Sequence, residues 1–188
     1  MTSVTEAFIL AGGQGRRMGY QDKGLVEYQG LPLIKHVIDA ITPQVQQLNI
    51  IANRNIDTYK NFDCPVYKDK QRGFLGPLAG IQTAFNHCQA DLLLIVPCDT
   101  PLLPSNLYQQ LEQQLINNNA NLAIACDELK THPVIMLVKT TLATSLNSYL
   151  ASDQRKVMKW CEQEHCCKVM FNSHYFTNFN TIESTIDS

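Results

Sequence analysis

Residues 7–24 read AFILAGGQGRRMGYQDKG, an apolar run followed by a loop rich in glycine and basic residues. The apolar run Ala7–Leu10 predicts a buried β-strand, because continuous apolar residues that end in a turn are typical of a strand in a parallel sheet. The glycines within residues 12–19 let backbone N–H groups come close to anionic oxygens. Arg17 and Lys23 add positive charge beside those groups. The stretch therefore predicts a strand followed by a polyphosphate-binding loop.

Two better-known glycine-rich loops do not fit this stretch. A dinucleotide-binding G-x-G-x-x-G fingerprint that starts at Gly13 would have Met18 at its last position. A P-loop requires serine or threonine after its Gly-Lys pair, whereas Lys23 is followed by Gly24. The loop therefore belongs to neither of these classes.

From Leu10 to Lys23 the stretch resembles the signature of nucleotidyltransferases that attach a nucleoside monophosphate to a phosphate-bearing acceptor. With Asp22–Leu25 included, it looks most like the loop of the molybdenum cofactor guanylyltransferases, which join GMP to molybdopterin. The resemblance implies a three-layer, Rossmann-like nucleotidyltransferase fold. It also implies one nucleotidyltransferase domain over residues 1–188, with a nucleotide-binding half at 1–104 and an acceptor-binding half at 105–188.

Outside the loop, strand-like and helix-like segments alternate along the chain. This order predicts an α/β fold in which helices pack on a mostly parallel central sheet. The predicted strands are residues 7–10, 47–52, 64–67, the apolar run that ends at Asp99, 122–126 and 134–138. The predicted helices are residues 32–41, 78–88, 107–116 and 142–150, and another opens within 153–158.

The composition is that of an ordinary globular protein. The chain has 188 residues, of which 45% are hydrophobic, and a formal net charge of -2, so one domain with a full core is the simplest expectation. Positive charge is local to the glycine loop, which favours a small anionic ligand and argues against nucleic acid. We expect neither a membrane span nor a signal peptide. Seven scattered cysteines are typical of reduced thiols in a reducing compartment, so a cytoplasmic protein is predicted. We also expect a monomer.

The second strong signal is the apolar run that ends at Asp99, between Pro97 and Pro101. Such a run is typical of a buried central strand and brings the Asp99 carboxylate to the carboxyl edge of the sheet. Nucleotidyl transfer requires neutralisation of phosphate charge, which Mg²⁺ held by one or two carboxylates and by substrate phosphates supplies. We therefore expect Asp99 to hold Mg²⁺. A role as a helix cap is the weaker alternative, because Ser105 and Asn106 can cap the next helix.

The first half of the chain carries the predicted nucleotide contacts, and all nine glycines lie between residues 12 and 80. Asn53 and Asp69 each follow a predicted strand, at the edge where parallel sheets bind ligands. For Asn53 an Asx turn is equally open. The resemblance implies that Gly76–Gly80 lies near the nucleoside. The expected nucleotide-binding residues are Leu10, Ala11, Gly12, Gly13, Gly15, Lys23, Asn53, Asp69, Gly76, Pro77, Leu78 and Asp99, and the expected catalytic residues are Arg17, Lys23 and Asp99.

The second half offers candidates for binding the acceptor. His132 precedes a proline and is therefore extended, and both an acceptor contact and a plain turn histidine are open. Arg155 and Lys156 lie at the start of a predicted helix, where cations oppose the helix dipole and favour an anionic partner, although a solvated helix start would look the same. Asn178 and Asn180 would face one side of an extended segment, in a stretch that resembles a late motif of the family.

The resemblance implies transfer of GMP from GTP to the terminal phosphate of molybdenum-bound molybdopterin, with release of pyrophosphate and formation of the guanine dinucleotide form of the cofactor. The implied partners are GTP, molybdopterin and, transiently, carrier or acceptor proteins of the molybdenum cofactor. A cytidylyltransferase acting on the same pterin, or another small-molecule nucleotidyltransferase, stays open because the glycine loop is shared. Two other classes are weaker: Met18 disfavours a dinucleotide-dependent oxidoreductase, and Lys23 and Asp99 disfavour a non-catalytic nucleotide-binding module.

Overall fold

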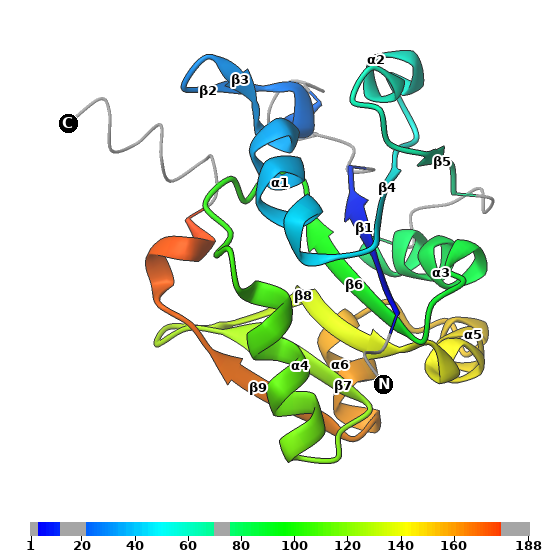
Figure 1. Cartoon of the computed structure of the whole chain (residues 1–188). Coiled ribbons are helices and arrows are strands. Elements are labelled where there is room, and N and C mark those ends of the chain that lie inside the picture. The colour runs from blue at the N-terminus through cyan, green and yellow to red at the C-terminus, as the bar shows by residue number, and fades with distance from the viewer. Residues whose placement is uncertain (1–3, 12–21, 70–75, 178–188) are drawn as a thin grey trace.

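The computed structural model describes residues 4–11, 22–69 and 76–177 (Figure 1). Across these residues, seven strands form one sheet in the order β5-β4-β1-β6-β8-β7-β9. In this sheet the two pairings made by β8 are antiparallel and the other four are parallel. The predicted mostly parallel central sheet is therefore confirmed. The strands are β1 (Thr5–Leu10), β4 (Gln47–Ile51), β5 (Val66–Tyr67), β6 (Leu92–Pro97), β7 (Leu122–Cys126), β8 (Thr131–Lys139) and β9 (Cys166–Met170).

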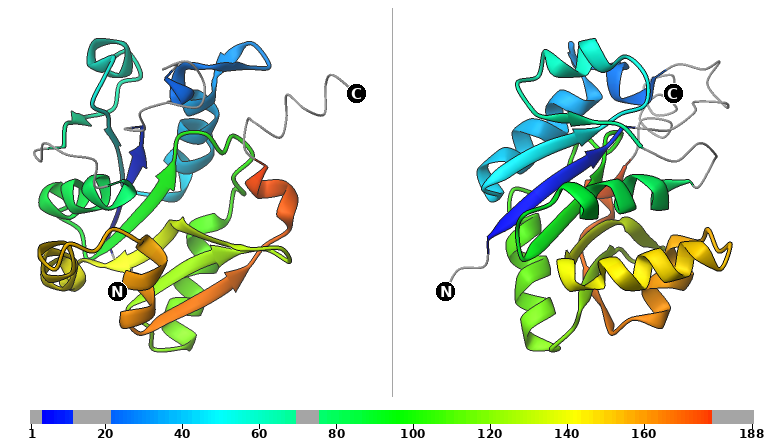
Figure 2. Two further views of the ribbon diagram at one scale, coloured as in Figure 1. Left: turned by 180° about the vertical axis from the view of Figure 1, so that it is seen from behind. Right: turned by 90° about the vertical axis from the view of Figure 1, so that its right-hand side faces the viewer.

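Helices cover both faces of this sheet and complete a three-layer fold (Figure 2). The larger helices are α1 (Leu33–Ile41), α3 (Pro77–His87), α4 (Leu107–Asn117), α5 (Ala143–Ala151) and α6 (Val157–Gln163). α1 and α4 pack on one face, while α3, α5 and α6 pack on the other. The alternation along β1 shows why: Ala7 and Ile9 belong to the first core, and Phe8 belongs to the second. The expected three-layer, Rossmann-like fold is confirmed, and none of the described helices combines the length and apolar character needed to cross a membrane.

The register of the central strands brings their carboxyl ends to one edge of the sheet. Leu10, at the end of β1, pairs with Ile51 of β4 on one side and with Pro97 of β6 on the other. β5 continues this edge, because Tyr67 pairs with Ile51. The segments that follow these four strands therefore start close together, as ligand-binding segments do in open α/β sheets. They contain the glycine loop, Asn53, Asp69 and Asp99.

Several short elements were not predicted from the sequence. β2 (Glu27–Tyr28) and β3 (Leu31–Pro32) form a short hairpin, and α2 (Ile56–Lys60) has five residues. None of these elements is long enough to show the regular spacing of apolar residues by which a helix or strand is recognised. β9 lies at the edge of the sheet and buries only Val169 fully, so its sequence lacks the continuous apolar run of a buried strand.

β8 is longer than predicted, because it begins at Thr131 and not at Val134. Its pairing with β7 shifts between Ile124 and Ala125, which leaves residues 133–135 opposite no residue of β7. Pro133 lies in this bulge, where the N–H that proline lacks is not needed by the ladder. His132 consequently belongs to a strand, and the plain turn histidine is wrong.

Candidate active site

An ion pair joins the segment after the glycine loop to the segment after β6. Lys23 Nζ lies 3.3 Å from Asp99 Oδ2, although the two residues are 76 positions apart. Their side chains are 35% and 22% exposed, so a ligand can reach both charges. A partly exposed pair is screened by solvent and contributes little, on the order of the 0–1 kcal/mol of a surface ion pair. A phosphate or a metal ion can therefore replace either partner at little cost in stability.

A second polar cluster joins the ends of β4 and β5. Asn53 Nδ2 donates to Asp69 Oδ2 at 2.8 Å, and the backbone N–H of Asp69 donates to Asn53 Oδ1 at 3.0 Å. Thr83 of α3 donates its hydroxyl to Asp69 Oδ1 at 2.8 Å. An Asx turn at Asn53 does not explain these bonds, because they cross from one strand end to the next. The cluster holds the Asn53 amide in one orientation at the ligand-binding edge.

Leu10 and Ala11 form the junction between β1 and the glycine loop. The Ala11 N–H donates to the Ile51 carbonyl at 2.8 Å, and the Leu10 carbonyl accepts from the Cys98 N–H at 3.2 Å. The Ala11 N–H is therefore committed to the sheet, and a nucleotide contact by Ala11 must use another atom. Leu10 also packs on α3: a Cβ on Gly80 would lie 3.0 Å from Leu10 Cδ2. The glycine at that position lets α3 approach β1 closely.

The start of α3 contains the three predicted residues Gly76, Pro77 and Leu78. Gly76 precedes the helix with φ 59° and ψ -151°, a backbone conformation that is essentially restricted to glycine. Pro77 occupies the first helical position, where its missing N–H is not required. The Leu78 side chain is fully buried in the core. Gly76 therefore has a backbone reason to be glycine, and Leu78 can offer a nucleotide only its backbone.

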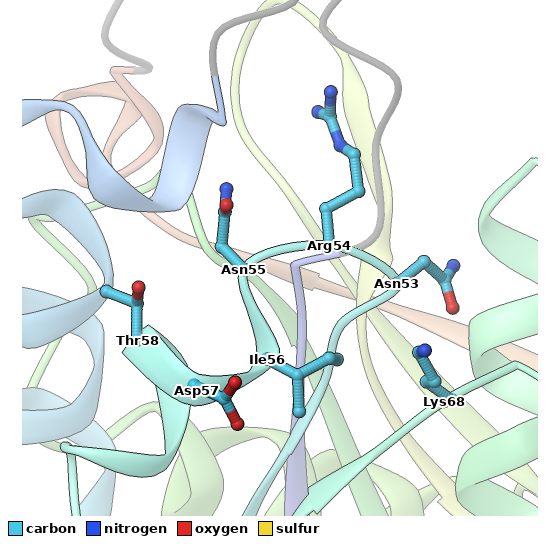
Figure 3. A pocket seen from close by; sticks show the side chains of 7 residues that line it. All are labelled: Asn53, Arg54, Asn55, Ile56, Asp57, Thr58 and Lys68. Carbon is cyan, nitrogen blue, oxygen red and sulfur yellow. The ribbon is translucent and has the colours of Figure 1, made fainter.

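A hollow of about 620 Å³ opens beside Asn53 (Figure 3). Its volume lies in the range typical of small-molecule sites. In Figure 3 the guanidinium of Arg54 extends away from the α2 turn, and Lys68 lies on the same side as Asn53. Two cationic side chains thus flank the predicted nucleoside contact. The residues that line the hollow are Asn53, Arg54, Asn55, Ile56, Asp57, Thr58 and Lys68.

His132, an acceptor candidate, forms a buried pair with Asp127. Nε2 of His132 lies 2.8 Å from Asp127 Oδ2, with side-chain exposures of 13% and 3%. The bond from His132 and those from the Leu129 and Lys130 N–H groups lower the pKa of Asp127 to about 2. The imidazole also packs against Phe176, with ring centroids 4.2 Å apart. One ring nitrogen of His132 is thus engaged within the protein.

The helix predicted to open within residues 153–158 begins at Val157, and Lys156 is its N-cap. Arg155 folds back on the end of α5: it donates to the Leu150 carbonyl at 3.0 Å and pairs with Asp153 at 2.5 Å. The argument from an unfavourable helix dipole is therefore wrong for Arg155, which lies beside the negative, C-terminal end of α5. Its guanidinium already has a structural role.

The predicted residues fall into three groups. At the edge of the sheet, the structure brings Lys23 to Asp99 and Asn53 to Asp69. Within the described residues, no hydrogen bond or ion pair joins His132 or Arg155 to this edge. Gly12, Gly13, Gly15, Arg17, Asn178 and Asn180 lie outside the described residues.

Comparison with known proteins gives the family. Residues 7–167 match the family model of the MobA-like NTP transferase domain. This chain belongs to that family. A molybdenum cofactor guanylyltransferase of Shewanella loihica is 45% identical over 185 residues, which are 97% of this chain and 94% of that protein.

Two solved structures share the fold of this MobA-like transferase. Molybdopterin-guanine dinucleotide biosynthesis protein A of Archaeoglobus fulgidus has a TM-score of 0.78 and 20% identity, with 97% of this chain and 95% of that chain covered. The 4-diphosphocytidyl-2C-methyl-D-erythritol synthase of Anaerococcus prevotii has a TM-score of 0.74 and 14% identity, with 98% of this chain and 94% of that chain covered. The family that the glycine loop resembles is confirmed by the family model and by the relative of 45% identity, and these two structures show the shared fold.

One carboxylate at this edge fits a metal ion whose other ligands would be water and substrate phosphates. Within the described residues, no three His, Cys, Asp or Glu side chains lie together as a metal-binding group. Mg²⁺ commonly uses one or two carboxylates and completes its shell with water and phosphate oxygens. Asp99 offers one accessible carboxylate of this kind. Asp69 is the poorer candidate, because both of its oxygens already accept hydrogen bonds.

Three polar residues at this edge were not predicted from the sequence. Thr83 is buried on α3 and bonds Asp69, but in the sequence it reads as one more residue of a helix. Asp22 and Tyr59 bond each other across 37 positions. Their positions along the chain do not reveal such a contact. The one hint in the sequence that Asp22 belongs to the site is its position directly before Lys23.

Proposed function

We propose that this MobA-like transferase moves GMP from GTP to the terminal phosphate of molybdenum-bound molybdopterin and releases pyrophosphate. The observation that carries the proposal is the Lys23–Asp99 pair, in which a cation and a carboxylate meet at the edge formed by β1, β4 and β6. The name of a relative 45% identical over nearly the whole chain supports GMP as the transferred group. It favours the guanylyltransferase over the cytidylyltransferase alternative.

The transfer proceeds directly between the two substrates. A terminal phosphate oxygen of molybdopterin forms a bond to the α-phosphorus of GTP, and the bond from that phosphorus to the bridging oxygen breaks. Pyrophosphate leaves with the electron pair. The attacking phosphate is largely ionised at neutral pH, so no general base has to remove a proton. The task of the protein is to hold the two phosphates in line and to offset their charge.

The residues at the edge divide this task. Lys23, together with Arg17 and the glycine loop, binds the β- and γ-phosphates, and it exchanges Asp99 for a phosphate oxygen when GTP binds. Asp99 would hold Mg²⁺, which would supply charge neutralisation at the phosphates. Asn53, oriented by Asp69, contacts the nucleoside side.

A covalent guanylyl-enzyme is not part of this mechanism. Two nucleophilic side chains adjoin Asp99 in sequence, Cys98 and Thr100, and both are buried. Burial, reinforced by the charges of Asp99 and Asp22, raises the pKa of the Cys98 thiol above its usual range. A thiol that stays protonated is a poor nucleophile. Labelled GTP should therefore leave no label on the protein after acid quenching, and a stable adduct would contradict direct transfer.

The acceptor is proposed to bind to residues of the second half, namely Arg155, Lys156, Asn178, Asn180 and His132. Arg155 has five N–H groups, and three of them are used by Leu150, Gln154 and Asp153. The other two have no partner among the described residues and can bind an acceptor phosphate without loss of the contacts to α5. We propose further that the protein is cytoplasmic and monomeric and contacts carrier or acceptor proteins of the molybdenum cofactor transiently.

The direct test is pyrophosphate release from GTP, CTP, ATP or UTP in the presence of molybdenum-bound molybdopterin and Mg²⁺. Release with GTP that depends on both the pterin and Mg²⁺ is expected. Preferential release with CTP would replace the guanylyltransferase by the cytidylyltransferase. Release without the pterin would point to hydrolysis and would contradict the proposal.

A further inference from the structure

Asp22, the residue before Lys23, is bonded through both carboxylate oxygens to the segment that contains α2. Tyr59 Oη donates to Asp22 Oδ1 at 2.6 Å, and Asn55 Nδ2 donates to Asp22 Oδ2 at 3.0 Å. Asp22 is buried and Tyr59 is fully buried. Hydrogen bonds to a carboxylate are stronger than neutral ones, and burial shields them from water. These contacts hold Asp22 firmly against α2.

The residue after Lys23 is held against the same tyrosine. A Cβ on Gly24 would lie 2.6 Å from Tyr59 Oη and 3.3 Å from the Cβ of Cys98. The backbone at Gly24 therefore packs directly on both residues. Cys98 precedes Asp99, so this packing also touches the chain that carries the carboxylate partner of Lys23. Lys23 thus lies between two residues whose positions are set by α2.

The hydroxyl of Tyr59 is a permanent donor in this arrangement. Burial is the main reason that the pKa of Tyr59 lies above its usual range, and the hydrogen bond to Asp22 and the charge of that carboxylate act in the same direction. The hydroxyl is therefore protonated at neutral pH and can donate to Asp22. Asn55 contributes a preset backbone, because its φ is 49°, in the left-handed region.

We propose that Tyr59, Asn55 and Asp22 are positioning residues that fix Lys23 for the phosphates of the nucleotide. The inference rests on the proposed function, in which Lys23 binds the β- and γ-phosphates. Asn55 lies two residues after Asn53, so the α2 segment ties the phosphate side of the site to the nucleoside side. A displacement of about 1 Å in a positioned group can cost roughly a hundredfold in rate. The three residues therefore act on turnover through Lys23, without contacting the nucleotide's phosphates themselves.

The first test is Tyr59→Phe, which removes the hydroxyl and keeps the ring. We expect kcat for pyrophosphate release to fall about tenfold, because the bond that holds Asp22 is lost and Lys23 is misplaced. Tyr108→Phe is the matched control, since it also removes a hydrogen bond from a tyrosine hydroxyl to a carboxylate: half-buried Tyr108 donates to Glu112 on α4. The control should keep wild-type kcat. Equal kcat values for Tyr59→Phe and wild type would overturn the inference.

A second variant tests the inference independently in case Tyr59→Phe does not fold. Asn55→Gly removes the amide that bonds Asp22, and glycine readily keeps the left-handed backbone. Asn119→Gly makes the same change at φ 48° in the turn after α4 and serves as its control. Asn55→Gly should lower kcat severalfold, and Asn119→Gly should leave it unchanged. Equal kcat values for the two would count against the role of the α2 segment.

The decisive measurement combines Tyr59→Phe with Lys23→Ala. If Tyr59 acts through Lys23, the double variant should turn over as slowly as Lys23→Ala alone, because nothing is left to position. A further tenfold loss in the double variant would show an independent structural effect and would overturn the inference. If Lys23→Ala itself kept full turnover, the proposed role of Lys23 in phosphate binding would be wrong. This result differs from the one that would overturn the positioning role of Tyr59.

A conservative substitution adds one more check. In Asp22→Asn the new side-chain oxygen can still accept a hydrogen bond from Tyr59. The new NH₂ group can donate to the side-chain oxygen of Asn55, provided that the Asn55 amide rotates by 180°. Asp22→Asn should therefore retain clearly more turnover than Asp22→Ala. Equal losses would mean that the negative charge, and not the hydrogen bonds, matters, and would contradict positioning.

Discussion

Lys23→Ala tests the part of the mechanism that depends most on the structure. The variant removes a cation that lies 3.3 Å from Asp99 and is 35% exposed. A hydrogen bond to a charged group is worth roughly 1.5–3 kcal/mol, so loss of the contact to a GTP phosphate should slow turnover about tenfold to a hundredfold. The folded protein loses much less, because the partly exposed pair is screened by solvent and contributes about 0–1 kcal/mol. For a chain of this length that corresponds to a shift in Tm of at most about 2–4 °C.

The assay is pyrophosphate release at saturating GTP, molybdopterin and Mg²⁺, with a melting curve on the same preparation. Lys35→Ala is the matched control, because Lys35 also forms an exposed ion pair, with Asp39 on α1, at 2.5 Å. It should change neither turnover nor Tm appreciably. If Lys23→Ala and Lys35→Ala turned over equally well with equal Tm values, Lys23 would be a bystander and the assignment of the phosphate site would be refuted.

Three further predictions follow from the site and its surroundings. Asp99→Asn should lower turnover about a thousandfold or more, since it removes the charge that would hold Mg²⁺, while Tm stays within about 2–4 °C; activity restored by raising Mg²⁺ would contradict this. Arg155→Ala should lower Tm, because the contacts to Leu150 and Asp153 are lost. It should also raise KM for molybdopterin and leave the affinity for GTP, measured by calorimetry, unchanged. Equally weakened binding of both substrates would contradict the division of the chain into a nucleotide-binding half and an acceptor-binding half. The folded-state pKa of Asp127, about 2, lies below the value of about 3.9 in unfolded chains, so its stabilisation is present above pH 4 and is lost as the pH falls towards 2. Asp127→Asn should flatten that part of the stability curve, and an unchanged slope in acid denaturation would argue against the Asp127–His132 pair.

Much of the fold could be predicted from local patterns. The continuous apolar runs of β1 and β6 predicted buried parallel strands, and the alternation of strands and helices predicted helices packed on a mostly parallel sheet. The same patterns predicted that Asn53, Asp69 and Asp99 follow strands at one edge of the sheet. β9 and α2 were missed because an edge strand is half exposed and a five-residue helix shows no period.

The partners of the site residues could not be predicted in the same way. Arg155 was expected to oppose a helix dipole, yet it bonds the end of the preceding helix α5. His132 was open between two roles, and the bulge in β8 with its pairing to Asp127 could be read only from the strand register. These contacts depend on where an element ends and how far a neighbouring strand is shifted. Neither quantity is visible in a local pattern.

Local patterns in the chain reveal the chemistry available to this protein: a glycine-rich loop with Lys23, a strand that ends in Asp99, and the order of elements that brings both to one edge. Burial and period are local properties of a chain, so they can be read from neighbouring residues. The contact of Lys23 with Asp99 across 76 positions and that of Tyr59 with Asp22 across 37 arise from tertiary packing. The reason is that a hydrogen-bond partner is chosen by the packing of distant elements and by the cost of leaving a buried polar group unpaired.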